Sequence, residues 1–313
     1  MTVSRRRPLA VLVAWLLAVV LLVGCSTAEE TPEEPPPPTI AVSGAFGRTP
    51  VVSFTPPLEL TEADSEVLIE GEGRLLEAGG PALLALSAYD GDTGEPLPDQ
   101  GGGHARTLLL TPEEVGEDVY PLLLDTAEGT RLLVTQPVAA EEGERMLVLV
   151  VDVLHTVAQG EELEQREDLP TVTQEADGVA ISLPDAEPPS SLEVETIIRG
   201  EGRQVAPGQA VTMQYAAVTW PGGDIYDSTW ADGQVPRTVM IDETFAGLRD
   251  GLVDQTVGSR VLVVIPPALG TGAQTLVFAV DVLAASDVAM EEPPEGTEEP
   301  AEGTEEPAPS DGR

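Results

Sequence analysis

The sequence predicts an α+β protein built from two copies of one domain. Three observations lead to this prediction. Two regions align without a gap at a constant shift of 129 residues, the shift that places Gly71 on Gly200. The second region contains alternating apolar and polar residues, which is typical of β-strands. Only one stretch of that region has the spacing of a helix, and repeats of this length indicate duplicated domains and not a solenoid.

Two short motifs mark the repeat at its two ends. The stretch GEGR occurs at residues 71–74 and again at 200–203, and VDVL at residues 151–154 recurs at 280–283. The glycines of GEGR lack the third glycine and the following helix that a dinucleotide site requires. We therefore interpret GEGR as a turn between strands. The 313 residues suffice for two domains that each bury a core.

Three strands and one helix are expected in the second region. The stretch AVTMQYAAVTW places four apolar residues on one face: Val211, Met213, Tyr215 and Ala217. Further strands are SRVLVVIPP from Ser259 and TLVFAVDVL from Thr275, which are rich in β-branched residues. The helix lies between them and the first strand, because Phe245, Leu248 and Leu252 follow helical spacing.

The N-terminus has the features of an export signal. A cluster of arginines precedes an apolar run at residues 9–23, and Gly24 and Cys25 follow. The run is shorter than the roughly 20 residues that cross a bilayer comfortably. The stretch LVGC at residues 22–25 resembles the lipobox of bacterial lipoproteins, whose cysteine is lipidated. We expect lipidation of Cys25, which would anchor the protein to the bacterial cell membrane on its extracytoplasmic side.

Composition sets the remaining boundaries. Stretches rich in proline and acid cannot bury apolar surface and are expected to be disordered; in the C-terminal one, EGTEEPA occurs twice in succession. The expected segments are a lipoprotein signal peptide at residues 1–24, a proline- and acid-rich spacer at 25–56, a first domain at 57–157, a linker at 158–189, a second domain at 190–286 and an acidic tail at 287–313.

The charge and the rarity of metal ligands exclude several classes of function. The net charge of −40, with 15 basic and 55 acidic residues, argues against a nucleic-acid partner and favours a soluble monomer. Two histidines and one cysteine cannot build a zinc site or an internal disulfide, and we expect no metal or cofactor. The stretch DGDTGE at residues 90–95 lacks the remaining ligands of a calcium loop and is interpreted as a hairpin turn.

Aromatic residues concentrate in the second region, whereas the first region keeps Tyr89 and Tyr120. The second region contains Tyr215, Trp220, Tyr226, Trp230, Phe245 and Phe278. Taken alone, these rings are equally consistent with the filling of a core.

The stretch GQAVTMQYAAVTWPGGDIYDSTW, followed by FAGLRDGLVDQTVGSRVLVVIPP and TLVFAVDVL, resembles FKBP-type peptidyl-prolyl isomerases. Members carry a strand that ends in a tyrosine, matched by Tyr215, and an aromatic-Asp-Ser pattern, matched by residues 226–228. A closing Leu-Val-Phe is matched by residues 276–278. The resemblance covers the second region nearly end to end and the first only through the repeat. It implies two FKBP-like domains, each a curved antiparallel sheet wrapped on one short helix.

The resemblance also implies an activity and its residues. The activity is cis–trans isomerisation of the bond before proline, whose barrier is about 18–20 kcal/mol. The residues implied to catalyse it in an aromatic pocket are Tyr215, Tyr226, Asp227, Phe245, Leu248 and Phe278. Those implied to bind the client beside them are Val239, Thr244, Leu269 and Trp230.

Three positions depart from the family pattern. Leu248 stands where the family has a tryptophan, Arg237 stands at a wall position that is usually aromatic, and Leu269 replaces a tyrosine that binds substrate. These changes reduce the ring surface and imply a shallower or slower pocket.

The first region keeps the core pattern but loses the implied pocket. The shift of 129 carries five of the pocket positions, those of Tyr215, Tyr226, Asp227, Phe245 and Phe278, onto non-aromatic residues: Leu86, Leu97, Pro98, Gly116 and Leu149. We expect this region to be non-catalytic. The leading hypothesis is a prolyl isomerase that assists proline-containing, unfolded or partly folded exported polypeptides. A non-catalytic binding module or holdase-type chaperone with the same fold, and a purely structural surface lipoprotein, remain as alternatives.

Overall fold

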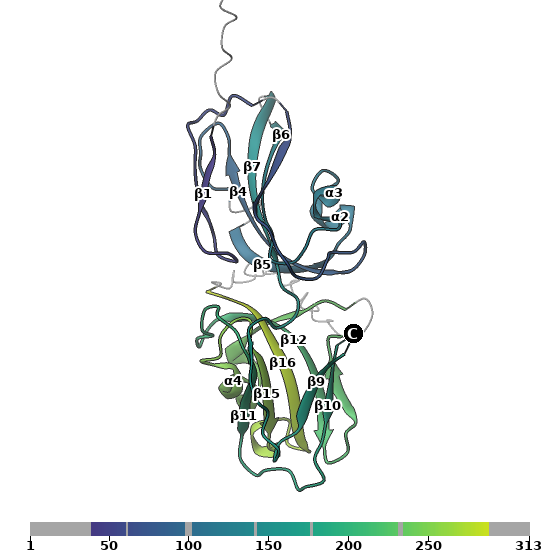
Figure 1. Ribbon diagram of the computed structural model, residues 1–313. Helices are drawn as coiled ribbons and strands as arrows, with labels where there is room; N and C mark the ends of the chain where they lie inside the picture. Colours follow the sequence, from purple (N-terminus) through teal and green to yellow (C-terminus); the bar gives the residue numbers. More distant parts are fainter. Residues whose placement is uncertain are drawn as a thin grey trace, which may run out of the picture. The chain divides into compact units, whose positions relative to one another are not determined.

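The computed structural model describes most of the chain between the two tails (Figure 1). The described residues are 39–60, 62–97, 102–140, 143–175, 178–230 and 234–287. The expected signal segment with Cys25, most of the acidic tail and Pro98 lie outside them. Among the described residues, no helix is both long and apolar enough to cross a bilayer.

The structure is strand-rich, with two separate main antiparallel sheets and a few short helices. The sheet nearer the C-terminus, called the second sheet, has the order β13-β12-β16-β15-β11-β8, with β14 also paired to β12. Its strands are β8 (Glu161–Glu162), β11 (Glu193–Arg199), β12 (Ala210–Trp220), β13 (Ile225–Ser228), β14 (Arg237–Met240), β15 (Arg260–Ile265) and β16 (Thr275–Ser286). The expected strands at 210–220, 259–267 and 275–283 are confirmed as β12, β15 and β16.

The helical turns of the second region pack against one face of the second sheet. Leu248 and Leu252 of α4 (Ala246–Leu252) are buried with the apolar side chains that β12, β15 and β16 turn to this face. A 3-10 turn, η2 (Ile241–Glu243), precedes α4, and another, η3 (Pro267–Leu269), follows β15. The helix starts after Phe245, because the backbone of Phe245 is extended, with φ −67° and ψ 151°.

The opposite face of the second sheet is covered by a hairpin that we did not expect. Strands β9 (Thr171–Glu175) and β10 (Gly178–Ser182) pair with each other, and their apolar residues pack with Trp220 and Leu262. Residues 158–189 are therefore not a simple linker, and this prediction is corrected. The acid-rich run before β9 obscured short strands whose apolar residues alternate only over five positions each.

The first sheet has the order β3-β6-β7-β4-β5. Its strands are β3 (Asp64–Ile69), β4 (Pro81–Asp90), β5 (Gly102–Leu109), β6 (Arg131–Ala140) and β7 (Gly143–Leu154). Two short helices, α2 (Pro112–Val115) and α3 (Tyr120–Leu123), contribute to the core on one face, where a single helix was expected.

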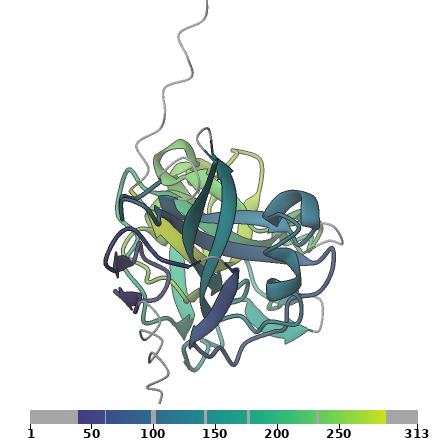
Figure 2. The same cartoon turned by 90° about the horizontal axis from the view of Figure 1, so that it is seen from above.

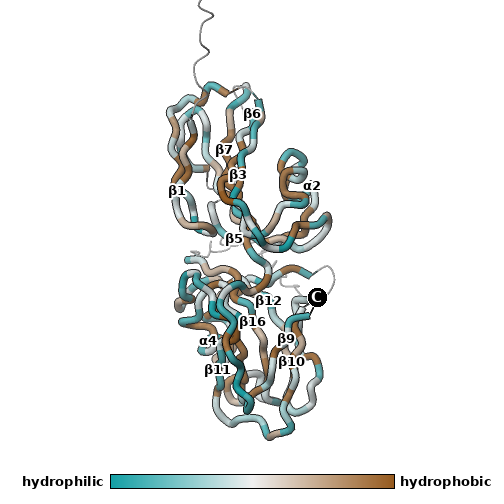
Figure 3. Tube along the Cα trace, viewed as in Figure 1, coloured by the Kyte–Doolittle hydropathy of each residue, from teal (hydrophilic) through white to brown (hydrophobic). Residues whose placement is uncertain are grey.

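A second hairpin covers the other face of the first sheet. Strands β1 (Ala41–Ser43) and β2 (Val51–Ser53) pair, and Val42, Val52 and Phe54 pack against that face. Figures 1 and 2 agree in placing this hairpin opposite α2 and α3. Residues 39–56 therefore belong to a folded element and not to the expected spacer, because their alternating apolar residues find a sheet to cover. Figure 3 shows hydrophobic residues along the strands of both sheets.

The two sheets share their strand registers at the shift of 129. Val67 on β3 pairs with Leu132 on β6, and at the corresponding positions Thr196 on β11 pairs with Val261 on β15. In both strands the register shifts directly after this pair, between Val67 and Ile69 and between Thr196 and Ile198. The left-handed backbone recurs as well, with φ 61° at Asp125 and 69° at its counterpart, Asp254. The repeat in the amino-acid sequence is thus also a repeat of backbone geometry.

The repeated GEGR motif has a packing role in each copy. The amide of Gly71 donates to Thr130 Oγ1 at 3.1 Å, and that of Gly200 donates to Ser259 Oγ at 3.0 Å. A Cβ atom at Gly71 or Gly200 would lie 2.4 or 2.3 Å from a backbone carbonyl oxygen of the neighbouring turn. Glycine is required there because no side chain fits.

Each sheet also contains one buried ion pair at corresponding positions. Arg131 binds Asp152 through Nε and Nη2 at 2.5 and 2.7 Å, and Arg260 binds Asp281 in the same two-pronged way at 2.6 and 2.7 Å. All four side chains are almost completely buried. The pair joins neighbouring strands in each sheet, β6 and β7 in the first and β15 and β16 in the second, so the repeat includes charged as well as apolar core positions.

Candidate functional site

Four aromatic rings meet on the face of the second sheet that packs against α4. Phe278 lies at their centre and is only 3% exposed. The ring centroids of Tyr215 and Phe245 are each 5.7 Å from that of Phe278, and the centroid of Tyr226 is 6.2 Å away. The inclined geometries are those that aromatic pairs prefer. We call these four residues the ring cluster.

The strand registers bring the ring cluster together. Ala217 on β12 faces Phe278 on β16, so Tyr215, two residues earlier, lies diagonally next to Phe278 on the same face. Tyr226 lies on β13 at a register irregularity, since Ala217 pairs with Asp227 and Val218 pairs with Ile225. A bulge of this kind re-aims a side chain, and here it presents Tyr226 at the cluster. Phe245 is the extended residue directly before α4, and its ring packs against Phe278 from there.

One side of the ring cluster is accessible. Tyr226 is 44% exposed, whereas Tyr215 and Phe278 are buried. Val239, Phe245 and Leu269 are half-buried and pack against the same core. The cluster therefore has a dry floor, to which buried Leu248 contributes, and a rim that solvent reaches.

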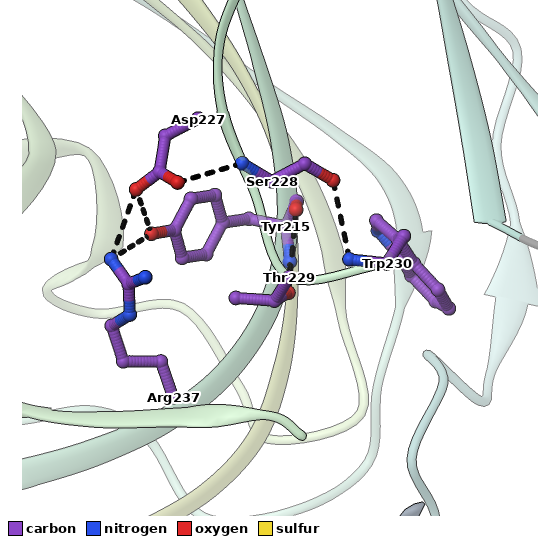
Figure 4. Close-up of polar contacts among 6 residues, drawn as sticks. All are labelled: Tyr215, Asp227, Ser228, Thr229, Trp230 and Arg237. Carbon is purple, nitrogen blue, oxygen red and sulfur yellow. Dashed lines mark hydrogen bonds and ion pairs between the residues drawn. The ribbon is translucent and has the colours of Figure 1, made fainter. Parts of the chain in front are cut away.

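A polar triad borders the ring cluster (Figure 4). The hydroxyl of Tyr215 donates a hydrogen bond to Asp227 Oδ2 at 2.6 Å. Nη1 of Arg237 donates to the same carboxylate oxygen at 2.9 Å and also to the Tyr215 hydroxyl. The guanidinium carbon of Arg237 lies 5.4 Å from the centroid of the Tyr215 ring, a favourable cation–π distance.

The triad sets the charge states of its members. Burial would raise the pKa of Asp227, but the hydrogen bonds from Tyr215 and Arg237, with the positive charge of Arg237, hold it below its usual value. Burial raises the pKa of Tyr215, and the hydrogen bond to Asp227 raises it further, against the charge of Arg237. At neutral pH the site therefore contains a carboxylate, a neutral phenol and a guanidinium.

Backbone amide hydrogen bonds fix the segment that carries Asp227. The Ser228 amide donates to Asp227 Oδ1 at 2.9 Å, and the Trp230 amide donates to Ser228 Oγ at 3.2 Å. The amide of Tyr215 donates to Thr229 Oγ1 at 2.9 Å. Residues 227–230 are thereby attached to β12, and the carboxylate is held in place by more than its own ion pair.

One of the residues implied to bind the client lies elsewhere than expected. The ring of Trp230 packs on Gly178 of β10 and points away from the triad in Figure 4, so its assignment to the site is corrected. Trp230 lies beyond the end of β13, where β10 of the unexpected hairpin provides its packing surface. The hydroxyl of Thr244 donates to Ile241 O at 2.8 Å and serves the turn before α4.

Sequence reasoning missed the role of Arg237, which we treated only as a loss of ring surface. Strand β14 pairs with β12 so that Arg237 faces Met213, the residue that shares a strand face with Tyr215. An arginine close in sequence to the tyrosine–aspartate pair was the available signal, but only the strand register shows that its side chain reaches both of them.

The corresponding positions of the first sheet contain no rings. Leu86 and Leu97 are half-buried, Leu149 is buried, and Gly116 has a left-handed φ of 90°. The hydroxyl of Tyr89 donates a hydrogen bond to Pro50 O at 2.6 Å, and the Tyr89 ring packs on the face of the first sheet that the β1–β2 hairpin covers. Within the described part of this sheet, no counterpart of the ring cluster occurs.

No metal site is found among the described residues, which hold no group of three or more potential ligands. The stretch at residues 90–95 forms a turn, as expected: Asp90 Oδ1 accepts the amides of Asp92 and Thr93 at 2.8 and 3.1 Å.

Comparisons with known proteins agree on one family. The family model described as FKBP-type peptidyl-prolyl cis-trans isomerase matches residues 201–284. A probable FK506-binding protein of Corynebacterium glutamicum is 32% identical over 114 residues, 34% of this chain and 96% of that protein. An FK506-binding protein of Streptomyces anulatus is 27% identical over 117 residues, 33% of this chain and 94% of that protein.

A solved structure was also found. The crystal structure of FkpA from Escherichia coli matches at 22% identity and a TM-score of 0.29. The match covers 39% of this chain and 53% of that chain, so this chain spans about half of the length of FkpA.

Proposed function

Because the chain belongs to the FKBP-type peptidyl-prolyl cis-trans isomerase family, we propose that its ring cluster binds the prolyl residue of a client polypeptide and speeds rotation about the preceding bond. The observation that carries this proposal is the packing of three rings around buried Phe278, with a rim open to solvent. The family supports the reaction, and the ring cluster supports its place in the second region.

The proposed mechanism needs no covalent step. A planar amide resists twisting by about 18–20 kcal/mol, because rotation removes its resonance. The twisted amide is less dipolar than the planar one, so a dry aromatic surface disfavours the planar ground state relative to the transition state. Each 1.4 kcal/mol of such a difference is about a tenfold increase in rate.

Within this proposal the polar triad positions the rings. Asp227 is held ionised by Arg237 and fixes the hydroxyl of Tyr215, so the Tyr215 ring stands at one angle beside Phe278. A fixed wall lowers the cost of ordering the site when a client binds.

We further propose that the two regions are two FKBP-like domains of which only the second is catalytic. The shared registers support one fold twice, and the leucines and glycine of the first sheet support the loss of its site. The first domain would then serve as a spacer, a client-binding surface or a stabilising partner.

The location and clients of the protein are proposals that rest on the sequence. The apolar run before Cys25 supports export and lipid anchoring, and the net charge of −40 supports a monomer. Outside the membrane, slow prolyl isomerisation limits the folding of many chains, so the proposed clients are exported, partly folded polypeptides.

The test compares matched positions in the two copies. Isomerisation of a chromogenic X-Pro peptide is measured with the full chain, with Tyr226→Ala and with Leu97→Ala at the corresponding position of the first sheet. We expect the wild type to exceed the uncatalysed rate. Tyr226→Ala should lower kcat/KM about tenfold or more, because the ring contact with the client is lost. Leu97→Ala should leave kcat/KM at the wild-type value. A wild-type rate equal to the uncatalysed one contradicts the proposal.

A second candidate is a non-catalytic binding module or holdase with the same fold. It is favoured by Leu248, Leu269 and Arg237, which replace ring surface at the site. This reading predicts that the chain slows the aggregation of an unfolded proline-containing protein while peptide isomerisation stays at the uncatalysed rate.

A further inference from the structure

Arg237 uses only part of its guanidinium group inside the protein. Both of its hydrogen bonds to described residues, to Asp227 and to the Tyr215 hydroxyl, run through Nη1. Nε and Nη2 have no hydrogen-bond partner within the described part of the chain. The side chain is 47% exposed, so these two nitrogens can meet an incoming molecule.

The position of Arg237 places those nitrogens beside the ring cluster. Strand β14 sets Arg237 two residues before Val239, which packs against the core of the cluster. The guanidinium carbon lies 5.4 Å from the centroid of Tyr215, a ring that itself packs on Phe278. A client that rests on the rings therefore brings its neighbouring main chain close to this guanidinium.

The guanidinium is also held in place before a client arrives. Asp227 pairs with it at 2.9 Å, and residues 227–230 are themselves attached to β12. An arginine side chain offers donors in a planar fork, so fixing one nitrogen orients the others. A pre-oriented cationic donor binds a carbonyl or carboxylate oxygen more strongly than a free side chain does.

We propose that Arg237 is a client-binding residue, whose Nε and Nη2 donate hydrogen bonds to an oxygen of the client next to the bound proline. The acceptor is either a main-chain carbonyl or the carboxylate of an acidic residue before the proline. This inference deepens the proposed function and rests on it.

The experiment uses the full chain and peptides of the form Ala-Xaa-Pro-Phe with glutamine or glutamate at Xaa. The variants are Arg237→Met, which removes all donors, and Arg237→Lys, which keeps the charge beside Asp227 but loses the fork. The control is Arg199→Met, which removes an exposed arginine paired with Glu161 on β8. kcat and KM are separated by titrating each peptide, and the melting temperature is followed in parallel.

We expect Arg237→Met to raise KM about tenfold or more, because the variant loses the hydrogen bonds that the charged guanidinium donates to the client. Arg237→Lys should raise KM by a smaller factor and keep the wild-type melting temperature, and Arg199→Met should match the wild type. An equal loss for both peptides identifies the main-chain carbonyl as the acceptor, and a loss for the glutamate peptide alone identifies the carboxylate.

Two results would overturn the inference. An active wild type combined with an unchanged KM in Arg237→Met, even with a lower kcat, would limit Arg237 to holding Asp227 and Tyr215. A wild type that leaves the uncatalysed rate unchanged would remove the proposed function and this inference with it.

Discussion

The carboxylate of Asp227 gathers hydrogen bonds from three sides at the edge of the ring cluster. Its donors are Tyr215, Arg237 and the Ser228 amide, and they hold its pKa below the usual value despite partial burial. A group whose pKa falls on folding stabilises the folded state above its unfolded pKa of about 3.9. That contribution is lost as the pH falls through the lower, folded value.

We therefore predict a pH-dependent effect of Asp227→Asn. The amide keeps the shape of the side chain but not its charge, so the variant should melt below the wild type at neutral pH. The difference should narrow as the pH falls below about 4, because the wild-type carboxyl then becomes neutral too. Melting curves followed by circular dichroism at several pH values check this, and a difference that stays constant down to pH values near 2 would contradict it.

Single residues also show where sequence reasoning stops. The rings Tyr215, Tyr226, Phe245 and Phe278 were predicted together, because a resemblance aligned them, and the structure brings all four into one cluster. The assignment of Trp230 to the client-binding residues was wrong, and the contacts of Arg237 with Asp227 and Tyr215 were missed. The surroundings of both side chains depend on which strands lie next to each other and in which register, and the sequence pattern of a single strand does not specify this.

At the scale of elements, long strands were predictable and short hairpins were not. Strand β12 carries apolar alternation and strands β15 and β16 are rich in β-branched residues, and the bounds of all three follow the predicted ones closely. The hairpins β1–β2 and β9–β10 have short strands next to proline- and acid-rich stretches, whose composition dominated the prediction. Isolated hairpins of this size are marginal in water, and these are stabilised by the sheets that they cover.

The β9–β10 hairpin leads to a prediction about fragments. A fragment of residues 190–286 lacks this hairpin and exposes Trp220, Leu262 and Val277 on the second sheet, whereas residues 158–287 keep them covered. We expect the longer fragment to melt cooperatively and the shorter one to melt at a lower temperature or to aggregate. Circular dichroism and light scattering on the two fragments decide the matter; equal stability would mean that the hairpin contributes little.

At the scale of the whole molecule, the chain repeats one backbone with two sets of side chains. The repeat includes details that composition cannot reveal, such as the matching irregularities in β3 and β11 and the buried pairs Arg131–Asp152 and Arg260–Asp281. Identical residues at a constant spacing predicted the duplication. The structural role of each of these residues became clear only from its contacts in the structure.

The GEGR glycines allow the two copies to be perturbed separately. Alanine at Gly71 or Gly200 places a Cβ atom within 2.4 Å of a backbone oxygen, and such overpacking costs about 1–3 kcal/mol or more. We expect Gly200→Ala to lose isomerase activity at a lower temperature than the wild type, and Gly71→Ala to keep the wild-type profile. Activity measured against temperature checks this, and an equal loss in Gly71→Ala would contradict catalysis by the second copy alone.

The matching registers carry a hazard during synthesis and refolding. A strand that has not yet paired in its own sheet can pair instead with strands of the other copy, because they have the same register. Such exchange between repeats is a known route to misassembly. Side-chain volume works against this exchange, since Phe278 in the place of Leu149 would overfill a core shaped for leucine. The difference in side-chain volume between the two cores is therefore expected to favour pairing of each strand within its own half.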